Sequence, residues 1–495
     1  MGTLTSQQPG FRKTAREATR VTIRFSLAAL VTFPLALAVA SAARGGQAER
    51  LSTTTDQQQL NVTIYNGVTS LIHDRRRVTL DAGRSSIAWR DVSANMDATS
   101  AIVDDLTAPG ATTVLEQNFN FDLLKPSALL DKYVGRQVTV VHEKPVFGRP
   151  NSETATLLAN NDGVVLRYRD RIETGLYDSH IVFPAIPENL RDRPTLVLDV
   201  HNAKGGTHDL DLSYLTGGLG WQADYVGVVS PNEDRMNVNG LVTLTNTTGT
   251  TYPNARLQLV AGNVNVVQPQ LRSIRRVMAR GTGEAMQQEN FFEYHLYTLD
   301  RPTTVANAQT KQVALLSAKN VPIRKTLELR GSESYYSNQN ADLGAKLNIG
   351  VYITFVNEGG QLGVPLPGGT FRLYKNDRRG TSQFLGSDQI DHTPRYQPVR
   401  LHLGDSFDVT ANKKQTDFKG LGGCTYESSY RVAISNAKDQ PQNVLVVEPI
   451  PGTWSIPSEN LAHTKTSSST ATWSLNLPAR KSVSLEYTAH VSLCI

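Results

Sequence analysis

Apolar and polar residues alternate with a period of two along most of the chain, and Gly, Asn and Pro clusters interrupt this alternation. A period of two places successive side chains on opposite faces of a strand, so that one face can be buried and the other can face water. The first expected strands are Val62–Ile64 and Ser70–Leu80, followed by a turn at Asp81–Gly83. Long helical periodicity is absent, and one short helix is expected at Ser127–Tyr133.

A second alternating block follows that helix, over residues 134–194, with a strong hairpin tip at Asn161–Gly163. Its segments are short and closely spaced. The pattern therefore predicts a small β-barrel or meander, inserted before the main part of the chain.

Longer strands return at Thr195 and are bounded by Gly, Asn or Pro at intervals of about ten residues, which is typical of a β-sandwich. The expected segments before residue 265 are Thr195–Asn202, His208–Gly218, Trp221–Val229, Gly240–Gly249 and Ala255–Val264. Strands resume after residue 290, and the last 70 or so residues join several strands through Pro/Gly corners. The fold class predicted is mainly β: several β-sandwich or immunoglobulin-like modules, a small inserted β-barrel or meander, and few short helices.

Residues 265–290 break the alternation and contain Arg275, Arg276 and Arg280. A mobile linker or loosely docked helix is the favoured interpretation. A basic amphipathic helix that touches a membrane is the alternative.

The chain is expected to divide into several modules and one linker. They are a signal peptide (1–42), an N-terminal β module (43–133), the small barrel or meander (134–194), a central sandwich in two parts (195–264 and 291–420) separated by the linker (265–290), and a C-terminal immunoglobulin-like domain (421–495).

The first 42 residues differ from the rest of the chain. Five basic residues precede the uncharged apolar run Phe25–Ala40, and two A-x-A sites follow at Ala38–Ala40 and Ala40–Ala42. This arrangement is typical of a secretory signal peptide. An uncleaved anchor is the alternative, although the run is short for a membrane span and contains Pro34. We expect export to the periplasm or cell surface and no membrane span after cleavage.

Removal of this segment changes the charge argument. The whole chain carries a net charge of +5, and residues 1–42 account for +4 of it, which leaves about +1 for the exported protein. A nearly neutral protein has no general attraction for nucleic acid, so no nucleic-acid partner is expected.

The chain has two cysteines, Cys424 and Cys494. In an exported protein such a pair predicts a disulfide, and two unpaired buried thiols are the alternative. If the strands that contain them pair antiparallel with Cys424 opposite Cys494, then Tyr426 lies opposite Ser492 and Arg431 lies opposite Tyr487.

Five stretches contain residue types that could carry chemistry. The glycines of Tyr214–Val229 are followed by a strand and not by a helix, which favours a tight turn backed by Trp221 over a phosphate loop. His201, His208, Asp209 and Asp211 flank a Gly-Gly turn, and a solvated hairpin is favoured over a metal site. Arg75–Arg77 is interpreted as the wet edge or face of a strand, not as an anion site.

Gly404–Ser406 is similar to a serine-hydrolase block but joins two alternating segments, so a hairpin turn is expected there. The Asn- and Asp-rich stretch Pro231–Gly240 does not match the calcium-loop pattern. No catalytic, metal-binding or cofactor-binding residue is therefore assigned.

Several ordered blocks resemble a known bacterial family. These blocks are Leu212–Val267, Glu293–Leu329, Leu366–Asp377, Gly404–Phe418 and Asn443–Ile456. Together they resemble the family called domain of unknown function 4139, some members of which are labelled mucoidy-inhibitor proteins, over roughly Thr195 to Leu493. The resemblance implies a β-rich exported protein with a central mobile insert. It supplies no catalytic residues.

The sequence favours an exported, non-catalytic β-sandwich protein of the bacterial envelope that binds another envelope protein or a polysaccharide. An envelope hydrolase that acts on a glycan or peptide through an unrecognised carboxylate/His site is the alternative. A deep pocket with converging titratable groups would favour the hydrolase.

Overall fold

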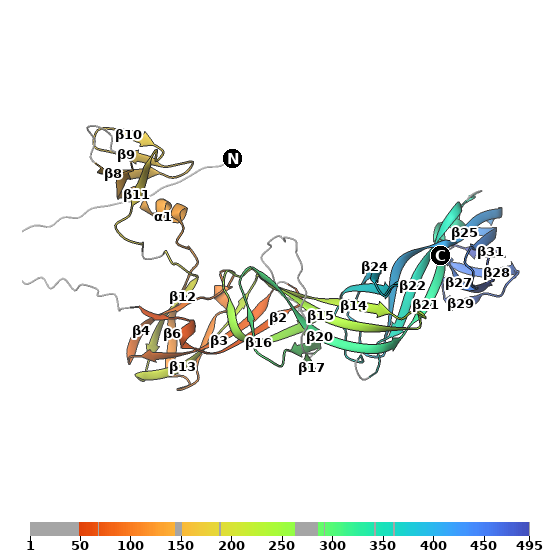
Figure 1. Cartoon of the computed structure of the whole chain (residues 1–495), viewed down its shortest axis with the longest axis horizontal. Coiled ribbons are helices and arrows are strands. Elements are labelled where there is room, and N and C mark those ends of the chain that lie inside the picture. The colour runs from red at the N-terminus through yellow and green to blue at the C-terminus, as the bar shows by residue number, and fades with distance from the viewer. Residues whose placement is uncertain are drawn as a thin grey trace, which may run out of the picture. The chain divides into compact units, whose positions relative to one another are not determined.

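The computed structural model describes residues 49–67, 69–143, 151–187, 190–262, 286–291, 293–340, 343–359 and 362–494. These residues form several open β-sheets, one α-helix and three short 3-10 helices (Figure 1). The mainly β fold expected from the alternation is confirmed, and none of the sheets closes into a barrel. The 3-10 helices are η1 (Thr54–Asp56), η2 (Ala98–Ser100) and η3 (Glu333–Tyr336).

Two sheets contain the N-terminal strands. One has the order β1-β4-β12-β6, and the other has the order β17-β18-β16-β2-β3-β13-β5, with β19 also paired to β16. The first sheet comprises β1 (Arg50–Ser52), β4 (Gly83–Arg90), β12 (Thr195–Asn202) and β6 (Thr112–Asn120). The second comprises β17 (Gln287–Phe291), β18 (Tyr294–Thr298), β16 (Tyr252–Ala261), β2 (Gln57–Tyr65), β3 (Ser70–Leu80), β13 (Gly206–Thr216), β5 (Ile102–Asp105) and β19 (Thr303–Val305).

Strands far apart in sequence are neighbours in the larger sheet. Strand β2 pairs antiparallel with β3 on one side and parallel with β16 on the other, with Val62 opposite Leu257. Strand β3 in turn pairs along its whole length with β13. Hydrogen bonding therefore joins the two expected modules 43–133 and 195–264, and Val62, Trp89 and Leu212 belong to one buried cluster.

The small insert is an open antiparallel sheet with the order β10-β9-β8-β7-β11, in which four consecutive strands are neighbours, as in a meander. Its strands are β7 (Gln137–His142), β8 (Ser152–Ala159), β9 (Val165–Arg167), β10 (Ile172–Thr174) and β11 (Ser179–Val182). Helix α1 (Pro126–Tyr133) starts with proline, which suits the first helical position because its missing N–H needs no partner there. The buried ring of Tyr133 packs in the core of the insert, and its hydroxyl donates to the carbonyl of Ala185 at 2.7 Å.

The central sheet has the order β20-β15-β14-β23-β24. It comprises β20 (Gln309–Pro322), β15 (Arg235–Asn246), β14 (Leu219–Val229), β23 (Gly369–Asn376) and β24 (Ser382–Ile390). Strands β14 and β23 run parallel, with Ala223 opposite Gly369. A side chain at Gly369 would overlap the carbonyl of Ala223, so this parallel pair requires glycine.

The expected linker 265–290 lies mostly outside the described residues. Its last four residues, Gln287–Asn290, differ from the expectation because they belong to β17, which pairs antiparallel with β18. The linker interpretation otherwise stays a prediction.

The C-terminal sheet has nine strands in the order β28-β31-β26-β25-β22-β21-β27-β30-β29. They are β21 (Arg324–Arg330), β22 (Gly344–Val356), β25 (Pro398–Gly422), β26 (Thr425–Asn436), β27 (Gln442–Pro449), β28 (Thr453–Glu459), β29 (Thr464–Ser467), β30 (Thr470–Leu477) and β31 (Ser482–Ser492). Although β30 and β31 are far apart in this order, the rings of Trp473 and Tyr487 lie 4.7 Å apart. The sheet therefore folds over itself, and its two halves enclose one core as in a sandwich.

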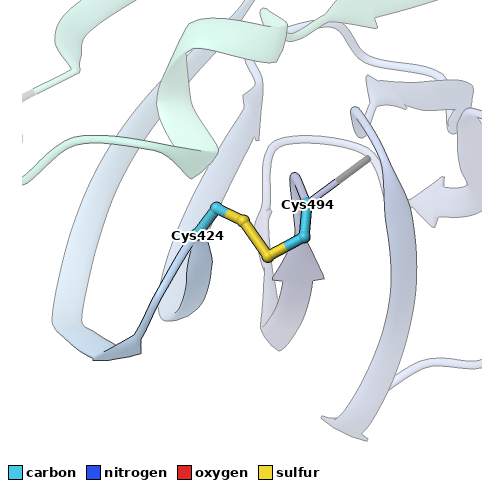
Figure 2. The surroundings of a disulfide bond; sticks show 2 residues. All are labelled: Cys424 and Cys494. Atoms are coloured by element: carbon cyan, nitrogen blue, oxygen red, sulfur yellow. A yellow bond between two sulfur atoms is a disulfide. The ribbon is translucent and has the colours of Figure 1, made fainter.

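A disulfide joins Cys424, at the start of β26, to Cys494, just after β31, with their Cα atoms 5.3 Å apart (Figure 2). The antiparallel pairing of β26 with β31 is as expected, but the expected register is wrong by one residue. Tyr426 lies opposite Val491, and Arg431 lies opposite Glu486. A slip of one residue exchanges the two faces of a strand. The expected register would have placed the exposed Arg431 beside the buried Tyr487, whereas the true one pairs Tyr487 with the buried Tyr430.

We expect the C-terminal part of the chain not to fold well by itself. A fragment of residues 210–495 lacks β2 and β3, which leaves one side of β16 and most of β13 without partners. Unpaired apolar strand edges promote aggregation. Size-exclusion chromatography and circular dichroism should show this fragment to be aggregated or partly unfolded beside a monodisperse fragment of residues 47–495. Equal melting temperatures for the two fragments would contradict the pairing described above.

Reduction of the disulfide should lower the melting temperature without changing the fold. The bond closes a loop of about 70 residues, so restriction of the unfolded chain is worth about 4 kcal/mol. The Cys424→Ser/Cys494→Ser double variant should match the reduced protein in melting temperature and keep the far-ultraviolet circular dichroism spectrum of the oxidised form. Labelling of two thiols per chain in the denatured, unreduced protein would show that the bond is absent.

Candidate functional site

The glycine-rich stretch from Tyr214 forms a tight corner, as the sequence predicts. Gly217 and Gly218 connect β13 to β14, which belong to different sheets, and Gly218 has a φ of +83°. Trp221 is buried behind the corner. The corner moves the chain from one sheet to the next, and no helix follows it that could bind a phosphate.

The two histidines of the expected hairpin do not converge. His201 is exposed on β12 and His208 is buried on β13, so the solvated hairpin expected from the sequence is wrong for His208. The reason is that β12 and β13 belong to separate sheets. Asp209 instead pairs with Arg77 at 2.7 Å, and Asp211 lies 3.3 Å from a ring nitrogen of His73.

His208 forms a buried pair with Asp105. Its Nδ1 lies 2.7 Å from Asp105 Oδ2, and its Nε2 lies 2.9 Å from the carbonyl oxygen of Lys204. Burial raises the pKa of Asp105, but hydrogen bonds from the Ala108 N–H, the Thr112 hydroxyl and His208 outweigh it, and the pKa is lowered. Because both ring nitrogens already face acceptors, His208 holds β5 against β13 and has no nitrogen left for a substrate.

The arginine run on β3 also departs from the expectation. Arg77 is exposed, but Arg76 is 1% exposed, so the wet-face interpretation is wrong for this residue. Its guanidinium donates to Asp74 at 2.7 Å and lies 4.8 Å from the ring of Trp89, whose indole N–H also donates to Asp74. The carbonyls of Ser52 and Arg90 accept its remaining hydrogen bonds. A fully paired charge of this kind can be buried without a large penalty.

Gly404–Ser406 lies within one continuous strand, β25, and is not the hairpin turn that the sequence predicts. Gly404 has a φ of +120°, and the pairing of β22 with β25 shifts register beside it. The glycine therefore produces a bulge, which lets the strand continue in place of turning. Ser406 accepts a hydrogen bond from the backbone N–H of Val409.

A buried ion pair that the sequence interpretation missed lies in the C-terminal core. Lys413 of β25 and Glu448 of β27 are 1% and 0% exposed, and Lys413 Nζ lies 2.7 Å from Glu448 Oε2. Tyrosines surround the pair. The hydroxyl of Tyr336 donates to Glu448 at 3.0 Å, Lys413 donates to the hydroxyl of Tyr487 at 3.1 Å, and the ring of Tyr335 lies 4.6 Å from the ammonium.

Burial in this cluster shifts the pKa values of Lys413 and Tyr336. Burial lowers the pKa of Lys413, and the nearby Glu448 carboxylate opposes that shift. Burial, together with the charge of Glu448, raises the pKa of Tyr336 well above its usual value. A side chain at Gly331 would overlap the Glu448 carboxylate, so the backbone itself closes one side of the cluster. Since solvent does not reach it, we assign this cluster a structural role.

The signal for this pair is present in the sequence. Val409 and Ala411 precede Lys413 at intervals of two, and Val444 and Val446 precede Glu448 in the same way. All four apolar residues are buried. A charged residue that continues a buried stripe on each of two strands is the pattern that predicts an internal ion pair.

In the described part of the chain, no group of three or more His, Cys, Asp or Glu side chains is arranged to hold a metal ion. Among the same residues, no helix is long and apolar enough to cross a membrane.

A groove of about 570 Å³ lies where β20 continues into β21 and β22 ends. Its volume falls in the range of roughly 300–1,000 Å³ that is usual for ligand sites. The buried residues Val321, Phe355 and Leu362 contribute to its lining, and Val356 is 39% exposed there. We call this hollow the Arg324 groove.

The charged residues in the lining of the groove are Lys319, Arg324 and Glu358, a net charge of +1. Among the described residues no carboxylate pairs with Arg324, whereas the neighbouring Lys325 pairs with Glu233 at 2.6 Å. The groove thus combines an apolar surface with a guanidinium that is available to an acidic group.

Asn357 fixes the wall of the groove. It is fully buried, its amide donates to the carbonyls of Val364 and Pro394, and its side-chain oxygen accepts from the N–H of Gly363. Gly363 and the backbone next to Glu358 are therefore held by a satisfied polar side chain, so this part of the wall needs little ordering when a ligand binds.

Removal of one member of the buried ion pair should be strongly destabilising. Lys413→Met leaves Glu448 charged and unpaired in the core, which should lower the free energy of unfolding by about 3–5 kcal/mol. The Lys413→Met/Glu448→Gln variant should be clearly more stable than Lys413→Met alone. Arg431→Met is the matched control, because Arg431 and Glu486 form a surface pair at 2.7 Å, and it should cost less than about 1 kcal/mol. Urea unfolding measures the free energy of unfolding of the three variants. An equal loss of stability in the buried and the surface variant would contradict the role of the pair.

Comparison with known proteins agrees with the sequence blocks noted above. A search of curated proteins found no match to the chain. The family model described as domain of unknown function (DUF4139) matches residues 210–493, which include β14 to β31 and most of β13. Since this match covers more than half of the 495 residues, the chain belongs to the DUF4139 family.

Proposed function

We propose that the chain is an exported, non-catalytic protein of the bacterial envelope, and that it binds a segment of another envelope protein in the Arg324 groove. The observation that carries this proposal is the groove itself, in which apolar side chains lie beside an arginine without an acidic partner among the described residues. Such a surface can bind a partner segment in which an apolar side chain lies next to an acidic side chain. The apolar one would contact the apolar lining, and the acidic one would pair with Arg324. The preformed wall at Asn357 supports it, because binding then requires little ordering of this chain.

Export is a separate part of the proposal. It is supported by the basic and apolar segments of residues 1–42, which lie outside the described residues, and by the Cys424–Cys494 disulfide, a bond favoured in oxidising compartments. N-terminal sequencing of the protein from an envelope fraction should start near Ser41 or Ala43. An intact Met1 on that protein would refute cleavage.

The binding site can be tested with a photo-crosslinking amino acid placed in living cells. At Val356, inside the groove, we expect a discrete adduct that protease digests. The same amino acid at Val182 is the control, because Val182 has a similar exposure of 45% but lies on the small inserted sheet. Arg324→Glu should reduce the Val356 adduct several-fold, because it replaces attraction to an acidic group by repulsion.

The outcomes separate the alternatives. A Val356 adduct that resists protease but is cut by glycan-degrading enzymes would point to a polysaccharide and overturn the proposed protein partner. Identical adducts at Val356 and Val182, or none at Val356, would show that the groove is not the binding site.

A further inference from the structure

A second, smaller pocket of about 440 Å³ lies away from the Arg324 groove, in the N-terminal part of the chain. Four separate parts of the sequence form its three walls: the segment after β1, the end of β4 together with the residues just before β12, and the start of β16. Its polar lining includes Thr53, Thr54, Arg90, Asp91, Arg193 and Thr250. We call it the Arg90 pocket.

The buried Arg76 holds two walls of this pocket together. It donates to the carbonyl of Ser52 at 2.9 Å and to the carbonyl of Arg90 at 2.8 Å. The third wall is joined to them through Asp91, whose carbonyl accepts from the Thr250 hydroxyl at 3.1 Å. The backbone of the pocket is therefore fixed in advance by hydrogen bonds in the core.

The two guanidiniums of the pocket are only partly used by the protein. Arg90 pairs through one terminal nitrogen with Asp192, and its Nε is buried without a hydrogen-bond partner in the described chain. Arg193 lies 3.4 Å from Asp91, which is longer than the roughly 2.7–2.9 Å of a good charged hydrogen bond. Both guanidiniums thus line one hollow, and Arg193 has no carboxylate at close hydrogen-bond distance among the described residues. Arg90 can meet a ligand only through its terminal nitrogens, because its Nε is buried.

We infer that the Arg90 pocket binds a small oxyanion group, a carboxylate or a phosphate, carried on a larger molecule. Planar guanidinium groups present parallel N–H donors that match the two oxygens of such a group. The hydroxyl of Thr54 can add a further donor, whereas that of Thr250 already donates to Asp91. Asp91 makes the pocket selective. Its negative charge opposes a second charge on the ligand, so a singly charged carboxylate binds more tightly than a phosphate dianion.

Calorimetric titration of the purified full chain with acetate and with inorganic phosphate, at constant ionic strength, tests this inference. We expect saturable binding of acetate, and weaker binding of phosphate. Arg193→Gln should weaken acetate binding at least about fivefold, because it removes one guanidinium. The matched control is Arg84→Gln. Arg84 is on β4, is exposed to a similar degree, and lies 3.3 Å from Asp199, close to the 3.4 Å between Arg193 and Asp91. This control should bind acetate as the natural chain does.

A second variant tests the selectivity. Asp91 has a φ of +68°, a conformation that asparagine tolerates, so Asp91→Asn should keep the fold while it removes the charge. Phosphate binding should then tighten several-fold relative to acetate. The inference is overturned if neither anion binds saturably, if Arg84→Gln weakens binding as much as Arg193→Gln, or if Asp91→Asn leaves the ratio of the two affinities unchanged. An unchanged melting temperature in each variant excludes unfolding as the cause.

Discussion

Lys413 and Glu448 can both lie inside the C-terminal core only because each neutralises the other at 2.7 Å. Transfer of either charge alone from water to a protein interior costs several kcal/mol, and this cost is recovered only where the geometry is good and the remaining donors and acceptors are satisfied. The tyrosines around the pair supply hydrogen-bond partners for Glu448 Oε2 and for Lys413, and the core of the sandwich is arranged about them. Glu448 Oε1 is buried without a hydrogen-bond partner among the described residues, so part of the cost remains. The same constraint governs Asp74 with Arg76 and Asp105 with His208.

The Lys413–Glu448 pair and Arg76 each join parts of the chain that the sheet hydrogen bonds alone would leave separate. Lys413 and Glu448 connect β25 to β27, which are not neighbours in the sheet. Arg76 connects β3 to Ser52 and to the end of β4, which belong to another sheet. A shifted arrangement of these elements would leave a charge unpaired, so the pairs favour one arrangement over its alternatives.

The period-two alternation was enough to predict a mainly β protein, the short helix, the corner at Gly217–Gly218 and the pairing of the strands next to Cys424 and Cys494. The prediction failed where a charged or polar side chain lies on the buried face of a strand. Arg76 and His208 were expected in water because their residue types usually are, yet both continue an alternating row of buried neighbours. The register of β26 against β31 was off by one because a cysteine can bond across a diagonal. Tyr430 and Tyr487, two buried rings that belong opposite each other, were the better guide.

The two surface hollows could not be predicted, because each is built from segments that only the tertiary structure brings together. The lining of the Arg90 pocket includes Thr53, Arg193 and Thr250, which are spread over about 200 residues. Arg324 is one of many basic residues in the sequence, and nothing in its neighbours along the chain indicates that it lacks an acidic partner. Which residues line a hollow, and which of them lack a partner, is determined by the tertiary structure.

The parallel pairing of β2 with β16 has a consequence for how the protein must be made. A chain that crosses a membrane from its N-terminus delivers β2 and β3 first, and these can form a hairpin at once. The partners on the two outer sides of that hairpin, β13 and β16, arrive only after more than a hundred further residues. During that interval both edges of an apolar ribbon are open, and contacts of such long sequence separation form slowly. If the chain is exported as proposed above, these edges would stay open to aggregation until the second half of the sheet has emerged.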